Sequence, residues 1–153
     1  MDHIDDIIRH AERHCKARGV RLTVKRKQVL VALVRSNKAL SAYQLIDFCK
    51  DHYGENMPAM SVYRILAFLE NERLVHKLNL ANKYVACAHI SCDHAHGVPQ
   101  FLICGKCRKV KEISTRPSMI ADLQVTVQEA GFKLATLQLE INCLCDDCVA
   151  QAA

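Results

Sequence analysis

The chain has 153 residues, of which 50% are hydrophobic and 24% are charged, enough apolar material for the cores of one or two small domains. It holds only three prolines and five glycines, and no apolar run approaches the roughly 18 residues that span a bilayer, so collagen-like, disordered and membrane-spanning chains are excluded. The net charge of +5 lies in the first half: residues 1–80 hold 14 Lys and Arg against 9 Asp and Glu, and residues 81–153 hold 7 of each kind. Such a basic half suits a polyanionic partner.

The N-terminal segment 1–6, with sequence MDHIDD, is acidic, whereas a signal peptide needs positive charge followed by an apolar stretch. We therefore expect a cytoplasmic protein. In the reducing cytosol, nine cysteines favour metal binding over a disulfide framework. Seven of the nine follow residue 80, so the sequence predicts a basic module followed by a metal-binding one.

Apolar residues at helical spacing predict four helices in the basic half. They run from Ile4 to a stop at Gly19, from about Thr23 to Val34, from the capping box that starts at Ser41, and from about Ala59 through Leu69. The ranges 74–78 and 83–87 then predict a hairpin, with asparagines suited to its turn.

Three helices and a following two-stranded ribbon, preceded by one extra helix, predict a winged helix-turn-helix domain. In that architecture the last helix places its N-terminal residues at base edges in the major groove. Arg64 is the predicted base reader, because a guanidinium pairs bidentately with guanine. The other predicted contacts are made with phosphate or a thymine methyl by Tyr43, Ser61 and Tyr63, and with phosphate by Arg21, Lys25 and Arg26. The competing interpretation is a solvated basic face on an interaction domain, which helix spacing does not separate from a DNA-binding one.

The strongest motif is a pair of CxxC sequences. Four thiolates complete a tetrahedral zinc site, and the cysteines concerned are Cys104, Cys107, Cys145 and Cys148. A redox CxxC would need no second pair and prefers a helix N-terminus, so we expect a structural zinc. Cys143 is left over and is interpreted as a packed thiol rather than a ligand.

The 37 residues between the two CxxC pairs are too many for a plain zinc ribbon. They predict a strand near 110–113, a helix from about 117 to 130 and a strand over 133–141, with another short strand at 101–104. The predicted inward face of that helix consists of Met119, Ile120, Leu123 and Val127. The overall prediction is an α+β chain: a winged helix-turn-helix domain followed by a small α/β domain stapled by zinc. Because such a unit has little core and an open sheet edge, we expect a homodimer formed through the sheet.

A second group of metal ligands lies between the halves. Pairing of the hairpin strands puts His76 and Cys87 diagonal to each other on one face, and this ligand pair suits zinc. Either His94 or His96, together with Glu112, could complete a four-coordinate site drawn from both domains. The spacing leaves the choice of ligands open.

Several of these motifs occur together in one known family. The stretches RLTVKR at 21–26, SVYRILAFL at 61–69 and LVHK at 74–77, followed by the two CxxC pairs in order, resemble the ferric uptake regulator family of bacterial metal-dependent repressors. The resemblance covers nearly the whole chain, and within the family the sequence is most similar to the zinc-uptake branch. It implies a regulatory zinc held by His76, Cys87, His96 and Glu112, and hence two zinc ions per protomer, one structural and one regulatory.

The function that this resemblance implies is a zinc-responsive repressor of zinc-uptake genes, with zinc as co-repressor. Its expected partners are double-stranded DNA with a pseudo-palindromic operator and a second copy of the chain, without a membrane or a small-molecule substrate. The domains implied are 1–87 for DNA binding, 88–98 as the hinge, and 99–153 for dimerisation and zinc. A sensor of iron, manganese, nickel or peroxide is the alternative within the family. An enzyme is not expected, since the sequence has no HExxH motif.

Overall fold

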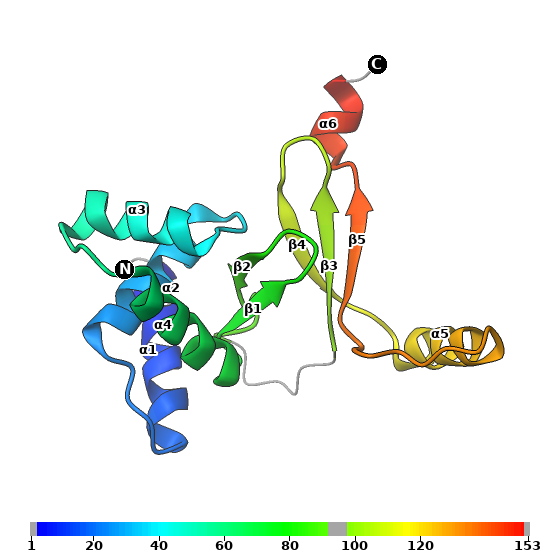
Figure 1. Ribbon diagram of the computed structural model, residues 1–153, viewed down its shortest axis with the longest axis horizontal. Coiled ribbons are helices and arrows are strands. Elements are labelled where there is room, and N and C mark those ends of the chain that lie inside the picture. The colour runs from blue at the N-terminus through cyan, green and yellow to red at the C-terminus, as the bar shows by residue number, and fades with distance from the viewer. Residues whose placement is uncertain (1–2, 92–97, 152–153) are drawn as a thin grey trace. The chain divides into compact units, whose positions relative to one another are not determined.

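The computed structural model describes residues 3–91 and 98–151, and the chain forms two compact units, Met1–Cys92 and Asp93–Ala153. The elements of the first unit are α1 (His3–Ala17), α2 (Val24–Ser36), α3 (Ala42–Tyr53), α4 (Ala59–Asn71), β1 (Val75–Leu78) and β2 (Lys83–Ala86). Those of the second are β3 (Pro99–Cys104), β4 (Val110–Ser114), α5 (Pro117–Glu129), β5 (Leu139–Cys143) and α6 (Asp146–Gln151) (Figure 1).

The helices of the first unit begin and end where their capping residues predict. After α1, Gly19 has a positive φ of 75°, a conformation that glycine adopts without the steric cost of a Cβ atom. Thr23 caps α2 by accepting the Arg26 N–H, and Ser41 forms a complete capping box with Gln44 at α3. These local contacts satisfy amide groups that the first helical turn leaves without partners. The four helices predicted from the sequence are confirmed.

The core of the first unit joins its helices to the hairpin. Its fully buried side chains include Val29, Leu30, Leu45, Leu66 and Leu69, which occupy one face of α2, α3 or α4. The hairpin β1–β2 is antiparallel, and Leu40 and Tyr84 exchange backbone hydrogen bonds of 2.9 and 2.8 Å. The hairpin therefore contacts both the segment before α3 and the helical core. It is the wing of a winged helix-turn-helix domain.

The second unit contains a three-stranded sheet with the order β4-β3-β5 (Figure 1). β3 is antiparallel to β4 and parallel to β5, because the chain returns through α5 before it enters β5. Phe101 and Gln100 on the central strand are fully buried. The mixed α/β architecture that the sequence predicts for this unit is confirmed, and α6 is an addition to it.

The predicted strand over 133–141 is wrong in its extent. β5 begins only at Leu139 and continues to Cys143, because its partner β3 offers a ladder from Gln100 to Cys104. The Gln100 side chain takes over the pairing where that ladder starts: its amide donates to the Leu137 carbonyl at 3.0 Å and its oxygen accepts the Leu139 N–H at 2.7 Å.

The predicted inward face of α5 is only partly correct. Ile120, Leu123 and Val127 are half-buried, but Met119 is 59% exposed and none of the 13 residues of α5 is buried. Within the described residues of the second unit, the apolar face of α5 is only partly covered.

Candidate metal centres and nucleic-acid interface

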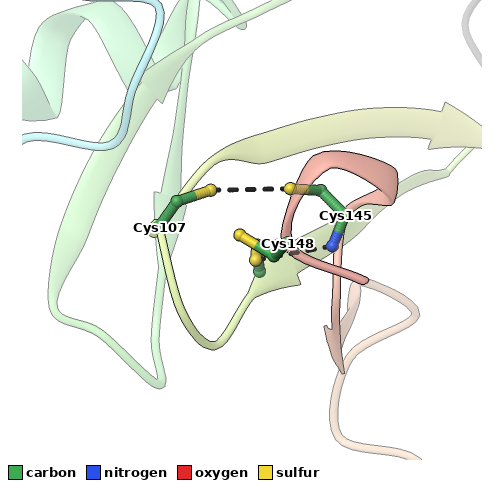
Figure 2. A group of neighbouring side chains, drawn as sticks. Cys107, Cys145 and Cys148 are labelled. Carbon is green, nitrogen blue, oxygen red and sulfur yellow. Dashed lines mark hydrogen bonds between the residues drawn. The ribbon is translucent and has the colours of Figure 1, made fainter. Parts of the chain in front are cut away.

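The four cysteines of the CxxC pairs come together in the second unit. Cys104 ends β3, Cys107 lies in the turn before β4, Cys145 directly precedes α6 and Cys148 lies within it. Their sulfur atoms all lie within 4.8 Å of one another, and the Sγ atoms of Cys107 and Cys145 are 3.7 Å apart. Figure 2 shows the side chains of Cys107, Cys145 and Cys148 converging from the turn and from the helix.

This arrangement fits zinc. A tetrahedral ion with Zn–S bonds of about 2.3 Å places its sulfurs roughly 3.8 Å apart, close to the observed 3.7 Å. The Cys145 N–H donates to the Cys104 sulfur at 3.4 Å, and backbone amides, that of Cys145 foremost, lower the pKa of the Cys104 thiol to about 5. Cys104 is thus poised as a thiolate, the form that binds metal.

The same cluster resists full ionisation in the absence of a cation. The Cys148 thiol is buried, and its pKa is raised to about 12 by the hydrogen bond with the Cys145 sulfur, by burial and by the other sulfurs of the cluster. Four negative sulfurs at such distances repel one another, and burial of Cys104 and Cys148 reduces the solvent screening of that repulsion. A divalent cation removes this conflict, so the donor set and its electrostatics both indicate a bound metal.

Cys143 is half-buried and stands apart from the four-cysteine cluster. It is the ladder partner of Cys104, and its carbonyl accepts the Gly105 N–H at 2.9 Å. Its backbone therefore holds the first CxxC turn against β5, while its thiol is not one of the four clustered sulfurs.

The wing carries the other two predicted soft ligands. His76 on β1 lies opposite Val85, and the Cys87 N–H donates to the Leu74 carbonyl at 2.9 Å directly after β2. Side chains at alternate positions share a face, so His76 and Cys87 lie diagonal to each other. Ligand atoms of the two residues lie within 4.8 Å, and Cys87 is 8% exposed.

The remaining predicted ligands belong to other parts of the chain. Glu112 lies on β4 of the second unit, opposite Phe101, and is half-buried. His94 and His96 lie outside the described residues. The structure therefore describes the wing pair and Glu112 each within its own unit, and the four-residue set remains a prediction.

The start of α4 presents the predicted DNA-contacting side chains. Arg64 and Tyr63 are exposed, and Ser61 is half-buried in the first turn, while the opposite face of α4 is buried. Tyr43, in the first turn of α3, is 66% exposed. The structure thus leaves polar and aromatic side chains accessible at the start of both helices, as base and phosphate contacts require.

The predicted phosphate contacts differ in their surroundings. Arg21 and Lys25 are exposed beside the start of α2, but the Arg26 guanidinium lies over the Phe68 ring. Met60, for which the sequence predicts no role, is 65% exposed in the first turn of α4. It lies outside the buried face formed by Val62, Ile65, Leu66 and Leu69.

An ion pair that the sequence did not reveal joins the ends of α1 and α4. Glu72 is 3% exposed, and the Arg18 Nε lies 2.5 Å from its carboxylate. A buried carboxylate needs such a partner. This contact fixes the additional N-terminal helix to the end of α4.

Together, the fold and the clustered cysteines define a winged helix-turn-helix regulator whose second unit carries a four-cysteine cluster suited to zinc. The sequence profile of the Ferric uptake regulator family matches residues 17–142, and the chain belongs to that family.

Two of the following three similar proteins carry zinc in their printed names. The chain is 34% identical to the zinc uptake regulation protein of Escherichia coli strain K12 over 145 residues, which cover 94% of this chain and 82% of the relative. A zinc uptake regulator complexed with zinc and DNA is 29% identical with a TM-score of 0.83, and all of both chains is covered. Holo XcZur is 33% identical with a TM-score of 0.77, over 96% of this chain and 99% of the other.

A relative with a different name matches less strongly. The peroxide operon regulator of Bacillus subtilis strain 168 is 27% identical over 133 residues, 87% of each chain.

In residues 3–91 and 98–151, no helix combines the length and the apolar character that crossing a bilayer requires.

Proposed function

We propose that the chain is a zinc-responsive, DNA-binding transcriptional repressor of zinc-uptake genes, for which zinc is the co-repressor. Its family consists of transcription regulators rather than enzymes. The observation that carries the proposal is the His76–Cys87 pair on the wing that follows α4, because it places metal ligands on the domain that carries the DNA-contacting residues. The similarity to a zinc uptake regulator complexed with zinc and DNA supports the binding of both zinc and DNA by this chain.

We assign two zinc ions to each protomer. The four-cysteine cluster holds the structural one, since four thiolates close the coordination shell. The regulatory one is held by His76, Cys87, His96 and Glu112, with His94 as the alternative to His96. A thiolate and an imidazole on one small face favour zinc over iron, and the sequence has no histidine after His96 that could serve an iron site in the second domain.

The functional division that follows from this assignment is 1–87 for DNA binding, 88–98 as the hinge and 99–153 for dimerisation. Ligands drawn from wing, hinge and second domain restrict the orientation of the DNA-binding domain when all of them are engaged. A coupling of about 1 to 3 kcal/mol between zinc and operator changes DNA affinity roughly 5- to 150-fold. Linkage requires DNA to tighten zinc binding by the same factor.

DNA recognition then follows from the first turns of α3 and α4. Arg64 reads guanine edges, while Tyr63, Ser61 and Tyr43 contact phosphate or thymine methyls. Two such domains related by a dyad require a pseudo-palindromic operator with half-sites about one helical turn apart.

The homodimer forms through the second unit. The apolar residues of α5 are at most half-buried within the second unit, and Met119 on this helix is 59% exposed, as is Phe132 directly after it at 72%. A second copy of the unit would bury the apolar face of α5 and satisfy an open sheet edge.

The test is operator binding by the purified dimer, before and after treatment with a chelator mild enough to spare the four-thiolate site. A duplex selected from a random pool by the zinc-loaded chain serves as the operator. We expect affinity to fall about 5- to 150-fold on chelation and to return with added zinc. Equal affinity in both states would refute control by zinc.

The second candidate is a family member that senses iron, manganese, nickel or peroxide. The 27% identity to the peroxide operon regulator of Bacillus subtilis favours it. Competition between metals at the regulatory site separates the two candidates. If iron, manganese or nickel restores operator binding better than zinc does, or if operator binding is lost only on peroxide treatment, the second candidate is correct and zinc sensing is not.

A further inference from the structure

The guanidinium of Arg26 is engaged inside the first unit. Its Cζ atom lies 3.6 Å from the centre of the Phe68 ring, and its Nη1 donates a hydrogen bond of 2.6 Å to the Arg21 carbonyl. A guanidinium is planar, so it can stack on an aromatic face and donate sideways at the same time. Arg26 makes both contacts here.

These two contacts join the parts of the first unit that carry the proposed DNA contacts. Phe68 lies on α4 four positions after Arg64, and therefore on the same side of that helix. Arg21 lies in the segment that leads into α2, and its own side chain is exposed. Arg26 thus connects the backbone that carries one proposed phosphate contact to the helix that carries the proposed base reader.

The neighbouring lysines of α2 do not share this arrangement. Lys25 is exposed, and Lys27 forms an ion pair with Glu12 of α1. Of the three consecutive basic residues, Arg26 alone has its charged group over an aromatic ring in the described residues. The basic run therefore contains residues in different roles, which composition does not distinguish.

We propose that Arg26 is a positioning residue for DNA binding: it fixes the Arg21 segment against α4, so that Arg21 and Arg64 reach one duplex together. This role differs from the phosphate contact that the basic pattern predicts for Arg26. The inference rests on the proposed DNA-binding function.

The experiment compares the full zinc-loaded chain with Arg26→Lys, Arg26→Gln and Phe68→Leu variants. Each is titrated with the duplex selected by the wild-type chain, at several potassium chloride concentrations. Lys25→Gln is the matched control, because Lys25 is adjacent, basic and exposed. Circular dichroism checks that each variant is folded.

A positioning role predicts that Arg26→Lys and Arg26→Gln weaken DNA binding by a similar factor, about 5- to 30-fold for interactions of this size. Arg26→Lys keeps the positive charge, so a direct phosphate contact at residue 26 would leave its salt slope at the wild-type value. In a positioning role, Arg26→Lys instead lowers the magnitude of the slope of log affinity against log salt by about 0.9, because Arg21 no longer reaches its phosphate, and Lys25→Gln lowers it by about 0.9 through its own lost contact. Phe68→Leu weakens binding in the same direction, and its effect is not additive with that of Arg26→Lys.

Three results would overturn the inference: wild-type affinity in Arg26→Lys, a wild-type salt slope in Arg26→Lys, or additive effects of Arg26→Lys and Phe68→Leu. If Arg26→Gln does not fold, the Arg26→Lys and Phe68→Leu pair still decides the question. Failure of the wild-type chain to select any duplex would instead remove the proposed function, so the two failures are distinguishable.

Discussion

The two units of this chain reach stability by different means. In the first unit, side chains from all four helices meet in a continuous buried cluster that also includes Val75 and Tyr84 of the wing. In the second unit, α5 has no buried residue, and the buried side chains gather near β3 and at Cys148 of the cysteine cluster. A continuous hydrophobic core thus joins the helices and wing of the first unit, whereas the second unit has few buried residues, two of which are cysteines of the metal-ligand cluster. We therefore expect removal of metal or of a metal ligand to affect the second unit more than the first.

Removal of one cysteine ligand should have the largest effect. Cys104→Ser leaves three thiolates and a weak hydroxyl donor, and zinc binding in structural sites contributes about 10 to 16 kcal/mol of folding free energy at neutral pH. We expect loss of the structural zinc and unfolding of the second unit, with the helical signal of the first unit retained. Zinc content and circular dichroism measure the two effects. Cys143→Ser is the matched control and should keep its zinc, and zinc loss from it as large as that from Cys104→Ser would show that the four clustered sulfurs do not by themselves make up the site.

A cavity in the first unit should produce the opposite pattern. Leu30→Ala removes a fully buried side chain and should lower the free energy of unfolding by about 2 to 5 kcal/mol. Zinc content of the four-cysteine site should be unchanged, because that site lies in the other unit. Urea denaturation monitored at the first unit, together with zinc analysis, tests this. Equal destabilisation of both units would mean that they fold as one body.

A charge on the exposed face of α5 should act on assembly rather than on folding. Met119→Glu introduces a carboxylate at a side chain that is 59% exposed in the single chain, so the unfolding of one protomer changes little. Buried in a dimer interface, the same charge should raise the dimer dissociation constant by about tenfold or more, the effect of losing at least about 1.4 kcal/mol. Analytical ultracentrifugation measures it. An unchanged dimer would place the interface elsewhere.

Loss of a helix cap should give the smallest effect. Thr23→Ala removes the hydroxyl that accepts the Arg26 N–H and should cost about 1 kcal/mol of unfolding free energy. Thr23→Ser keeps the acceptor and is the matched control. Thermal melting of the first unit distinguishes them, and identical melting temperatures would show that this cap contributes nothing to the stability of α2.

The sequence predicted those features that depend on local patterns or on spacing. The capping box at Ser41 and the stop after α1 were visible because the residues that make them are neighbours in the chain. The CxxC pairs were visible because metal chemistry fixes the ligand types. The register of strand pairing could not be predicted in this way. β5 begins at Leu139, whose N–H donates to the side chain of Gln100, 39 positions earlier in the chain, and no local propensity encodes such a contact.

Side-chain roles on the surface were equally hard to predict. Lys25 and Arg26 look alike as consecutive basic residues, and only the packing of α2 against α4 puts one of them over Phe68. The buried Glu72 was hidden for the same reason, since its partner Arg18 is 54 positions away. Met119 was predicted to face inward because helical periodicity identifies an apolar face without identifying the chain that covers it.

In the proposed function, a removable zinc ion bound by His76 and Cys87 of the wing controls the affinity for operator DNA. The most direct measurement is the operator affinity of the wild-type chain and of His76→Ala as a function of free zinc, with the four-cysteine site filled throughout. We expect the wild-type affinity to rise about 5- to 150-fold with zinc, while His76→Ala stays at the zinc-free value as an intact dimer. A zinc response of the same size in His76→Ala would contradict this account.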